Sequence, residues 1–266
     1  MIKKFVKKIV DLLGYKIINM KSQNKNFEGF SNLETFKKVV KLLRGGAEKF
    51  IIFDIGTNHG QFVDLYLKIM KDLSIHDYEI HCFEPNISLA AKLKELKNQN
   101  IFVNNLAIIN KVGEKRFFIN EEDQKSSFYK FASYKSKGKE TFVKTTTIDE
   151  YCRIKNINKI AIIKIDTEGT EPEVLEGSKK MIINNKVDCI YSELAIGKLY
   201  KDKELSILSL EKYLHDKFQL VGISLNRDYY KDKDNKFISI FHSLNQKDFV
   251  LDLCYLYINK KNLVES

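Results

Sequence analysis

The chain of 266 residues alternates between short apolar runs and longer stretches in which hydrophobic residues recur at helical spacing. The apolar runs predict strands at residues 50–55, 79–83, 101–103, 160–165, 187–192, 219–224 and 251–258. The helical spacing predicts helices at residues 61–71, 87–96, 173–183 and 204–215. Strands and helices in alternation indicate an α/β fold, with a mostly parallel, doubly wound sheet covered by helices on both faces.

The segment after the third predicted strand breaks this alternation. Residues 107–110 and 115–119 are typical of two short strands around a turn at residues 112–114. The polar stretch 120–140 follows, and it is too long for an ordinary connection, which makes it a candidate lid or binding loop. Nearer the C-terminus, residues 226–235 are typical of a solvated loop and residues 236–244 of an additional strand.

Three helix starts carry a recognisable signature. Ser31, Thr147 and Thr170 are each followed three residues later by a glutamate. In such a capping box the hydroxyl and the carboxylate satisfy free backbone N–H groups at the start of a helix. We therefore expect these glutamates to serve as caps and to take no part in chemistry.

The first residues form a basic amphipathic pattern. Residues 2–13 place apolar side chains on one helical face and lysines on the other. Such a helix can lie on an anionic membrane surface or can pack on its own domain, and the pattern fits both. We divide the chain into an N-terminal helical segment, residues 1–45, and one domain, residues 46–266. With no apolar run of about 18 residues and no secretory signal, we expect a cytoplasmic protein, peripheral on the inner membrane face if the helix binds lipid.

The net charge of +10 arises mainly at the N-terminus. Residues 1–26 hold seven lysines and Asp11, a net charge of +6, which leaves only +4 for the rest of the chain. Of the 45 positive residues 41 are lysine, and no arginine-rich stripe is present, so we expect no nucleic-acid partner. The four cysteines lie far apart in mostly apolar runs, as reduced core residues do.

The first chemical signal is the segment FDIGTNHG, which joins the first strand to the first helix. Gly56 and Gly60 permit a tight turn at the carboxyl edge of the sheet, where doubly wound folds bind nucleotide-like cofactors. The spacing G-x-x-x-G differs from the dinucleotide pattern G-x-G-x-x-G, which argues against a dehydrogenase. Asp54, just before the turn, would repel a pyrophosphate but suits a cationic part of a ligand.

Further acids follow other strands at the same edge. Glu84, at the end of the second strand, can accept both hydroxyls of a ribose. Asp166 and Glu168 end the fourth strand and Glu193 the fifth. These three acids can bind a sulfonium, hold a divalent ion or accept a proton from a hydroxyl. We predict no metal.

Five segments, FDIGTNHG, FEPN, VNNLAI, TTIDEY and IKIDTEGTEPEVLEG, together resemble the FkbM family of S-adenosylmethionine-dependent methyltransferases. They run in the family's order from about Phe50 to Glu193. The resemblance implies a Rossmann-like class I methyltransferase fold with a seven-stranded sheet and an antiparallel last strand. It also implies methyl transfer from S-adenosylmethionine to a hydroxyl, often on a sugar of a surface glycan or on a natural product.

The same resemblance implies roles for individual residues. Those expected to line the methionine half of the cofactor are Asp54, Gly56, Thr57, Asn58 and Gly60, with Asp166 at the methyl. Glu84 would hold the ribose, and Asn105 and Ala107 would lie near the adenine. The hydroxyl proton would go to Asp166 or Glu193 in preference to His59. Glu168 and Ser127 would face the acceptor.

Two other functions stay open at this point. The first is a methyltransferase that acts on RNA or protein, against which stands the absence of a tetrapeptide such as Asn-Pro-Pro-Tyr after the fourth strand. The second is a non-catalytic binding module that keeps the fold and docks on a membrane. The residues do not name the acceptor.

Overall fold

The computed structural model describes residues 33–44, 49–119, 126–130, 139–200, 203–225 and 250–264. The amphipathic helix and Ser31 lie outside these residues, and so do the loop and the strand expected within residues 226–244. In the described part, no helix is both long enough and apolar enough to cross a membrane.

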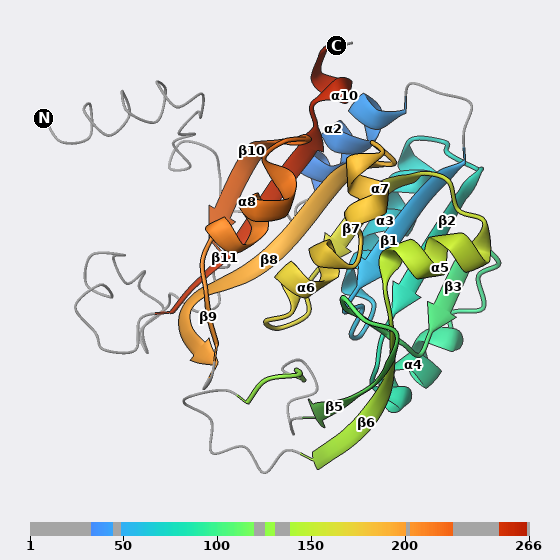
Figure 1. The fold of residues 1–266 in the computed structure, drawn as a ribbon. Coiled ribbons are helices and arrows are strands. Elements are labelled where there is room, and N and C mark those ends of the chain that lie inside the picture. The colour runs from blue at the N-terminus through green and yellow to red at the C-terminus, as the bar shows by residue number, and fades with distance from the viewer. Residues whose placement is uncertain are drawn as a thin grey trace, which may run out of the picture.

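The centre of the molecule is one sheet with the strand order β3-β2-β1-β7-β8-β11-β10 (Figure 1). Its strands are β1 (Phe50–Ile55), β2 (Tyr78–Phe83), β3 (Ile101–Asn104), β7 (Ile160–Ile165), β8 (Val187–Tyr200), β10 (Phe218–Leu225) and β11 (Val250–Asn259). The first five run parallel, and β11 lies between β8 and β10, antiparallel to both. A short strand, β9 (Lys203–Leu205), pairs with the far end of β8. The predicted α/β fold with an antiparallel last strand is confirmed.

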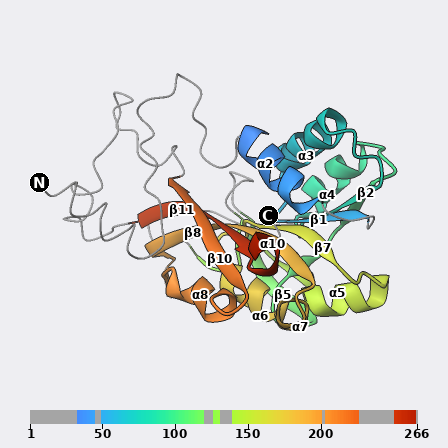
Figure 2. The same cartoon turned by 90° about the horizontal axis from the view of Figure 1, so that it is seen from above.

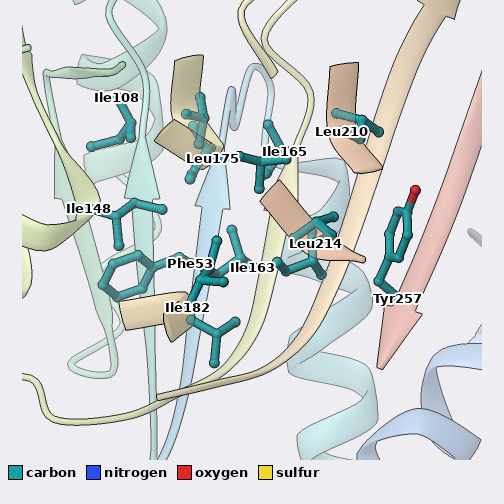
Figure 3. Packing of buried hydrophobic residues seen from close by; sticks show 14 of the residues in the cluster. Phe53, Ile108, Ile148, Ile163, Ile165, Leu175, Ile182, Leu210, Leu214 and Tyr257 are labelled. Atoms are coloured by element: carbon teal, nitrogen blue, oxygen red, sulfur yellow. The ribbon is translucent and has the colours of Figure 1, made fainter. Parts of the chain in front are cut away.

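Helices cover both faces of the sheet (Figure 2). One face carries α2 (Leu33–Leu43), α3 (Gln61–Asp72) and α4 (Ile87–Lys94), and the other carries α5 (Ile148–Lys155), α6 (Glu171–Glu176), α7 (Lys179–Ile183) and α8 (Leu208–Leu214). A last turn, α10 (Lys261–Val264), follows β11. Each central strand supplies both layers because its side chains alternate between faces. In β1, Ile52 packs in the core under α2 and α3, whereas Phe53 packs with Ile163 and Leu175 in the core of the other face (Figure 3).

A second, three-stranded sheet corrects the prediction for residues 107–119. It has the order β4 (Ala107–Ile108), β6 (Lys139–Thr146), β5 (Gly113–Ile119). The first two strands do not pair with each other, because β6 lies between them, parallel to β4 and antiparallel to β5. Part of β6 belongs to the stretch expected to be loop. The segment 126–130 joins this sheet through a bridge between Phe118 and Ser127.

Three element boundaries also differ from the prediction. The helix expected over residues 173–183 is two helices, α6 and α7, separated at Gly177, where a Cβ would overlap the carbonyl oxygen of Ile109. The helix expected from residue 204 begins at Leu208, since β9 precedes it. Strand β8 continues to Tyr200, well beyond the predicted end at residue 192.

Of the two capping boxes in the described residues, one forms only its hydroxyl half. The Thr147 hydroxyl accepts a hydrogen bond from the Glu150 N–H at 3.0 Å. The Glu150 carboxylate, expected to cap the helix, instead accepts from the Arg153 guanidinium at 2.7 and 2.8 Å. Thr170 also stands at a helix start, but its side chain makes no cap hydrogen bond, and its buried hydroxyl has no hydrogen-bond partner in the described chain. The carboxylate of Glu173, the other half of that box, binds side chains of other elements instead.

Candidate active site

The turn between β1 and α3 depends on two glycines. Gly56 has a φ of +78°, and a Cβ there would overlap the backbone carbonyl oxygen of Asp166 at the end of the neighbouring strand β7. Gly60, with a φ of +85°, begins α3, and a Cβ there would lie 2.9 Å from the side chain of Leu93 on α4. The two glycines therefore let the turn lie close against both β7 and α4.

The residues inside this turn are held to strand β2. The Thr57 hydroxyl donates to the carbonyl of Asp54 at 2.8 Å and accepts from the Phe83 N–H at 3.1 Å, so it serves the turn. Asn58 adopts a φ of +53°, a conformation that asparagine tolerates better than most residues. Its side-chain oxygen is buried and has no hydrogen-bond partner among the described residues, which leaves it able to accept one.

Glu84 follows β2, and its carboxylate lies beside the glycine turn. One oxygen accepts from the Asn86 N–H at 2.8 Å and the other from the Asn58 N–H at 2.9 Å. Glu84 is 5% exposed, and burial raises the pKa of its carboxyl to about 7, although both backbone hydrogen bonds oppose the rise. Because a carboxylate offers about four acceptor positions, two remain for further hydroxyl donors.

Asp54 and Asp166 share a buried lysine that the sequence analysis left without a role. The Lys164 ammonium lies 3.3 Å from Asp54 Oδ1 and 3.2 Å from Asp166 Oδ2, and it donates to the Gly56 carbonyl at 2.9 Å. Burial raises the pKa of Asp54, and Lys164 opposes that shift. For Lys164 itself, burial lowers the pKa, but Asp166, Asp54 and Glu193 outweigh burial and raise it. The signal in the sequence was a lysine within an otherwise apolar strand.

The loop after β7 is built around a second buried carboxylate, that of Glu171. It accepts from the N–H groups of Thr167 and Gly169, at 3.1 and 3.0 Å, and from the Thr167 hydroxyl. Burial raises the pKa of Glu171 to about 7. Between the two donors, Glu168 takes a φ of +52°, in the left-handed region. Glu171 was not predicted as a site residue because it stands inside the expected capping box.

The segment 126–130 is fastened to this loop. The Ser127 hydroxyl donates to the Glu168 carbonyl, and the Tyr200 hydroxyl lies 3.3 Å from the Glu168 carboxylate. Close by, Glu173 accepts from the Tyr129 hydroxyl at 2.7 Å and pairs with Lys203 at 2.6 Å. Glu173 therefore holds segment 126–130 and β9 together, which corrects its predicted role as a cap.

Three more predicted site residues have distinct surroundings. Asn105 donates to the carbonyls of Glu84 and Pro85, both at 2.9 Å, and so lies beside the Glu84 turn. Ala107 is buried in the apolar core of the small sheet, where its methyl group packs with Phe117 and Phe128. His59 is exposed on the turn.

The prediction that Glu193 ends the fifth strand was wrong. It lies within β8, opposite Cys254 of β11. Because β7 ends opposite Ser192, Glu193 nevertheless lies just past the carboxyl end of β7, and its charge raises the pKa of Lys164.

The structure thus brings Asp54, Gly56, Asn58, Glu84 and Asp166 together at the carboxyl ends of β1, β2 and β7. Within the described ranges, no group of three His, Cys, Asp or Glu side chains is placed to hold a metal ion. The arrangement offers hydroxyl acceptors at Glu84, an open amide oxygen at Asn58 and carboxylates that can face a cation.

Comparison with known proteins agrees with this geometry. Residues 54–219, more than half of the chain, match the model of the methyltransferase FkbM domain. The 2-O-methyltransferase NoeI of Sinorhizobium fredii is 24% identical over an aligned length of 188 residues, and the match covers 64% of this chain and 73% of that protein.

Two similar solved structures are a cyclopropane synthase, MmaA2, from Mycobacterium tuberculosis and a proposed sarcosine dimethylglycine methyltransferase from Galdieria sulphuraria. The first has a TM-score of 0.41 and 8% identity over 88% of this chain and 87% of its own. The second has a TM-score of 0.46 and 10% identity over 85% and 83%. On the match over residues 54–219, the chain belongs to the FkbM methyltransferase family.

Proposed function

We propose that this protein transfers a methyl group from S-adenosylmethionine to a hydroxyl group, on a sugar of a surface glycan or of a glycosylated natural product. The observation that carries the cofactor assignment is the buried carboxylate of Glu84. It is oriented by two backbone N–H groups at the carboxyl edge of the sheet, and two acceptor positions remain. This is the recognition that the two hydroxyls of a ribose need.

The other residues of the turn fit the rest of such a cofactor. The unpartnered amide oxygen of Asn58 can accept from an ammonium group, and the missing side chain at Gly56 leaves the backbone open to a close approach. The carboxylates of Asp54 and Asp166 suit a cationic ligand. When bound, the cofactor supplies a methyl group made electrophilic by its sulfonium.

The chain's own contribution to the reaction is alignment and proton removal. The acceptor oxygen must lie in line with the methyl and the sulfur, and such positioning can supply several kcal/mol of the barrier. Asp166, whose side chain is 30% exposed and ion-paired to Lys164, is our first candidate for the base. Glu193 comes next, and His59 last because it is exposed on the turn.

The acceptor proposal rests on a separate observation. NoeI is named as a 2-O-methyltransferase, which favours oxygen as the methylated atom. On the acceptor side we assign Glu168 and Ser127, which the structure joins through the Glu168 carbonyl. No observation on this chain favours RNA or protein as the substrate. A cytoplasmic location also stays a prediction.

Calorimetric titration with S-adenosylhomocysteine tests the cofactor site. We expect micromolar binding to the wild type and a loss of at least about 30-fold in E84A, because removal of the carboxylate costs about 2 kcal/mol or more of charge-assisted hydrogen bonding.

E79A is the matched control. Glu79 stands on the same strand, but its carboxylate pairs with Lys49 at 2.9 Å, near the amino end of the sheet. We expect its affinity to stay within twofold of wild type. A folded wild type that binds no S-adenosylhomocysteine would refute the proposal.

A further inference from the structure

Lys164 lies at the centre of this site, and neither the proposed alignment of the acceptor nor the removal of its proton gives this buried lysine a role. It lies on β7 opposite Asp54 of β1, in register, and is 3% exposed. Its ammonium also lies 5.0 Å from the centre of the Phe62 ring on α3. A buried lysine on a central strand is costly unless its charge is compensated, so its contacts need an explanation.

The polar contacts of the Lys164 ammonium are made to the glycine turn and to the residues that flank it. The ammonium donates to the Gly56 carbonyl and pairs with one oxygen each of Asp54 and Asp166. In the part of the chain that the structure describes, no other cation lies within 4 Å of either carboxylate. Lys164 therefore offsets one of two adjacent negative charges and fixes the position of both.

The compensation is partial. The Asp54 carboxylate is completely buried, and neither oxygen has a donor in hydrogen-bonding geometry among the described residues, since the ammonium meets Oδ1 only as an ion pair. Glu193 and Glu84 add further negative charge within electrostatic range of Lys164 or Asp54. The site thus keeps an excess of negative charge that Lys164 reduces by one.

We propose that Lys164 is a positioning residue that sets the charge experienced by the sulfur of the cofactor, an inference that rests on the proposed function. During transfer the new C–O bond forms as the C–S bond breaks, and the electron pair of that bond returns to the sulfur. The hydroxyl proton passes to a base. The positive charge on sulfur therefore disappears. A site that holds the sulfonium too strongly slows this step, because it stabilises the ground state more than the transition state. Lys164 weakens the binding of the sulfonium and so limits this stabilisation of the ground state.

The test compares two ligands of nearly equal shape and different charge. S-adenosylmethionine carries the sulfonium, whereas S-adenosylhomocysteine carries a neutral thioether. We would measure both dissociation constants by calorimetry for the wild type, K164M and K164R. The quantity compared is the dissociation constant of S-adenosylhomocysteine divided by that of S-adenosylmethionine. We expect this ratio to rise about tenfold in K164M, ~1.4 kcal/mol, and to stay within twofold of wild type in K164R.

A lysine at the other end of the same strand provides a matched control. Lys159 lies 3.2 Å from the buried carboxylate of Asp188 but precedes β7, at the edge of the sheet away from the glycine turn. K159M also removes a lysine from a buried aspartate. We expect its ratio to equal that of the wild type, because no charge near the cofactor has changed.

If K164M does not fold, D54N and the double variant D54N/K164M carry the test. D54N alone removes a negative charge, so its ratio should fall, whereas the double variant restores the original charge balance and should return close to wild type. The inference is wrong if K164M weakens both ligands by the same factor, or if D54N leaves the ratio unchanged. Absence of binding to the wild type is a different result, which rejects the proposed function itself.

Discussion

Two glutamates of the site, Glu84 and Glu171, are buried carboxylates held by backbone N–H groups. In both, burial raises the pKa to about 7. A raised carboxyl pKa favours the folded state when the group is protonated. This contribution to stability is fully present below the unfolded pKa and is lost as the pH rises through about 7. The two carboxyls differ in function, because Glu84 keeps acceptor positions for a ligand and Glu171 uses its oxygens on its own loop.

The first prediction concerns the pH dependence of cofactor binding. Hydroxyl donors need the ionised form of Glu84, so the affinity for S-adenosylhomocysteine should rise with pH and level off above about 7. Below that value we expect a loss approaching tenfold per pH unit, as for a single required ionisation. Calorimetry between pH 5.5 and 8.5 measures this. E84Q should bind weakly with a flat profile, while E171Q should keep the slope; a flat wild-type profile would contradict the prediction.

We expect the same substitution at the two threonines that begin helices to change the stability of the fold in different ways. Thr147 makes a cap hydrogen bond to Glu150, so T147V should destabilise the fold by about 1 kcal/mol. Thr170 has a buried hydroxyl without a partner in the described chain, so T170V should be neutral or stabilise by up to about 1 kcal/mol. Urea unfolding of both variants checks this. Equal losses would show that the Thr170 hydroxyl has a function in the fold.

At the scale of elements, the parallel strands were predictable because each is a short apolar run that must be buried on both faces. Strand β6 was missed, since Lys139–Thr146 is mostly polar and its Phe142 is exposed, a pattern that resembles a loop. The pairing of β4 and β5 with β6 could not be predicted for the same reason. The end of β8 was also missed, because its extension pairs with β11 and β9, which are distant in the sequence.

The residues of the site also divide into those that the sequence predicts and those that it does not. Gly56 and Glu84 were predictable because the chemistry of each follows from its place after a strand. Lys164 and Glu171 were not, because their partners come from different elements or from a local fold of the loop. The interpretation of Glu173 failed since its partners, Tyr129 and Lys203, become neighbours only in the folded chain.

The glycine turn gives a prediction at this scale. G56A should cost about 3 kcal/mol or more and abolish cofactor binding, because a left-handed backbone combines with an overlap on the Asp166 carbonyl. The matched control is G113A at the start of β5, which also has a positive φ, +148°, but has no atom within 4 Å of the added Cβ. Thermal unfolding and titration should show a smaller loss of stability and unchanged binding for G113A. Similar effects of the two substitutions would refute the argument from overlap.

At the scale of the whole molecule, the basic residues 2–13 predict a contact with membranes that the described residues do not test. Removal of residues 1–20 takes away five of the seven lysines within residues 1–26 and leaves Lys21 and Lys25. We expect the truncated protein to lose partition onto vesicles of anionic lipid while keeping its affinity for S-adenosylhomocysteine. Sedimentation with vesicles measures the first and calorimetry the second. Unchanged partition would mean that the segment packs on its own domain.

The place of β11 in the sheet has a consequence for synthesis on the ribosome. Strands β8 and β10 are made first, yet neither pairs with the other, because β11 separates them. Until residues 250–259 emerge from the exit tunnel, one edge of β8 and one of β10 therefore expose free backbone N–H and C=O groups. The nascent chain is then most open to pairing with other chains, so translational pauses shortly before β11 should increase aggregation or the demand for chaperones.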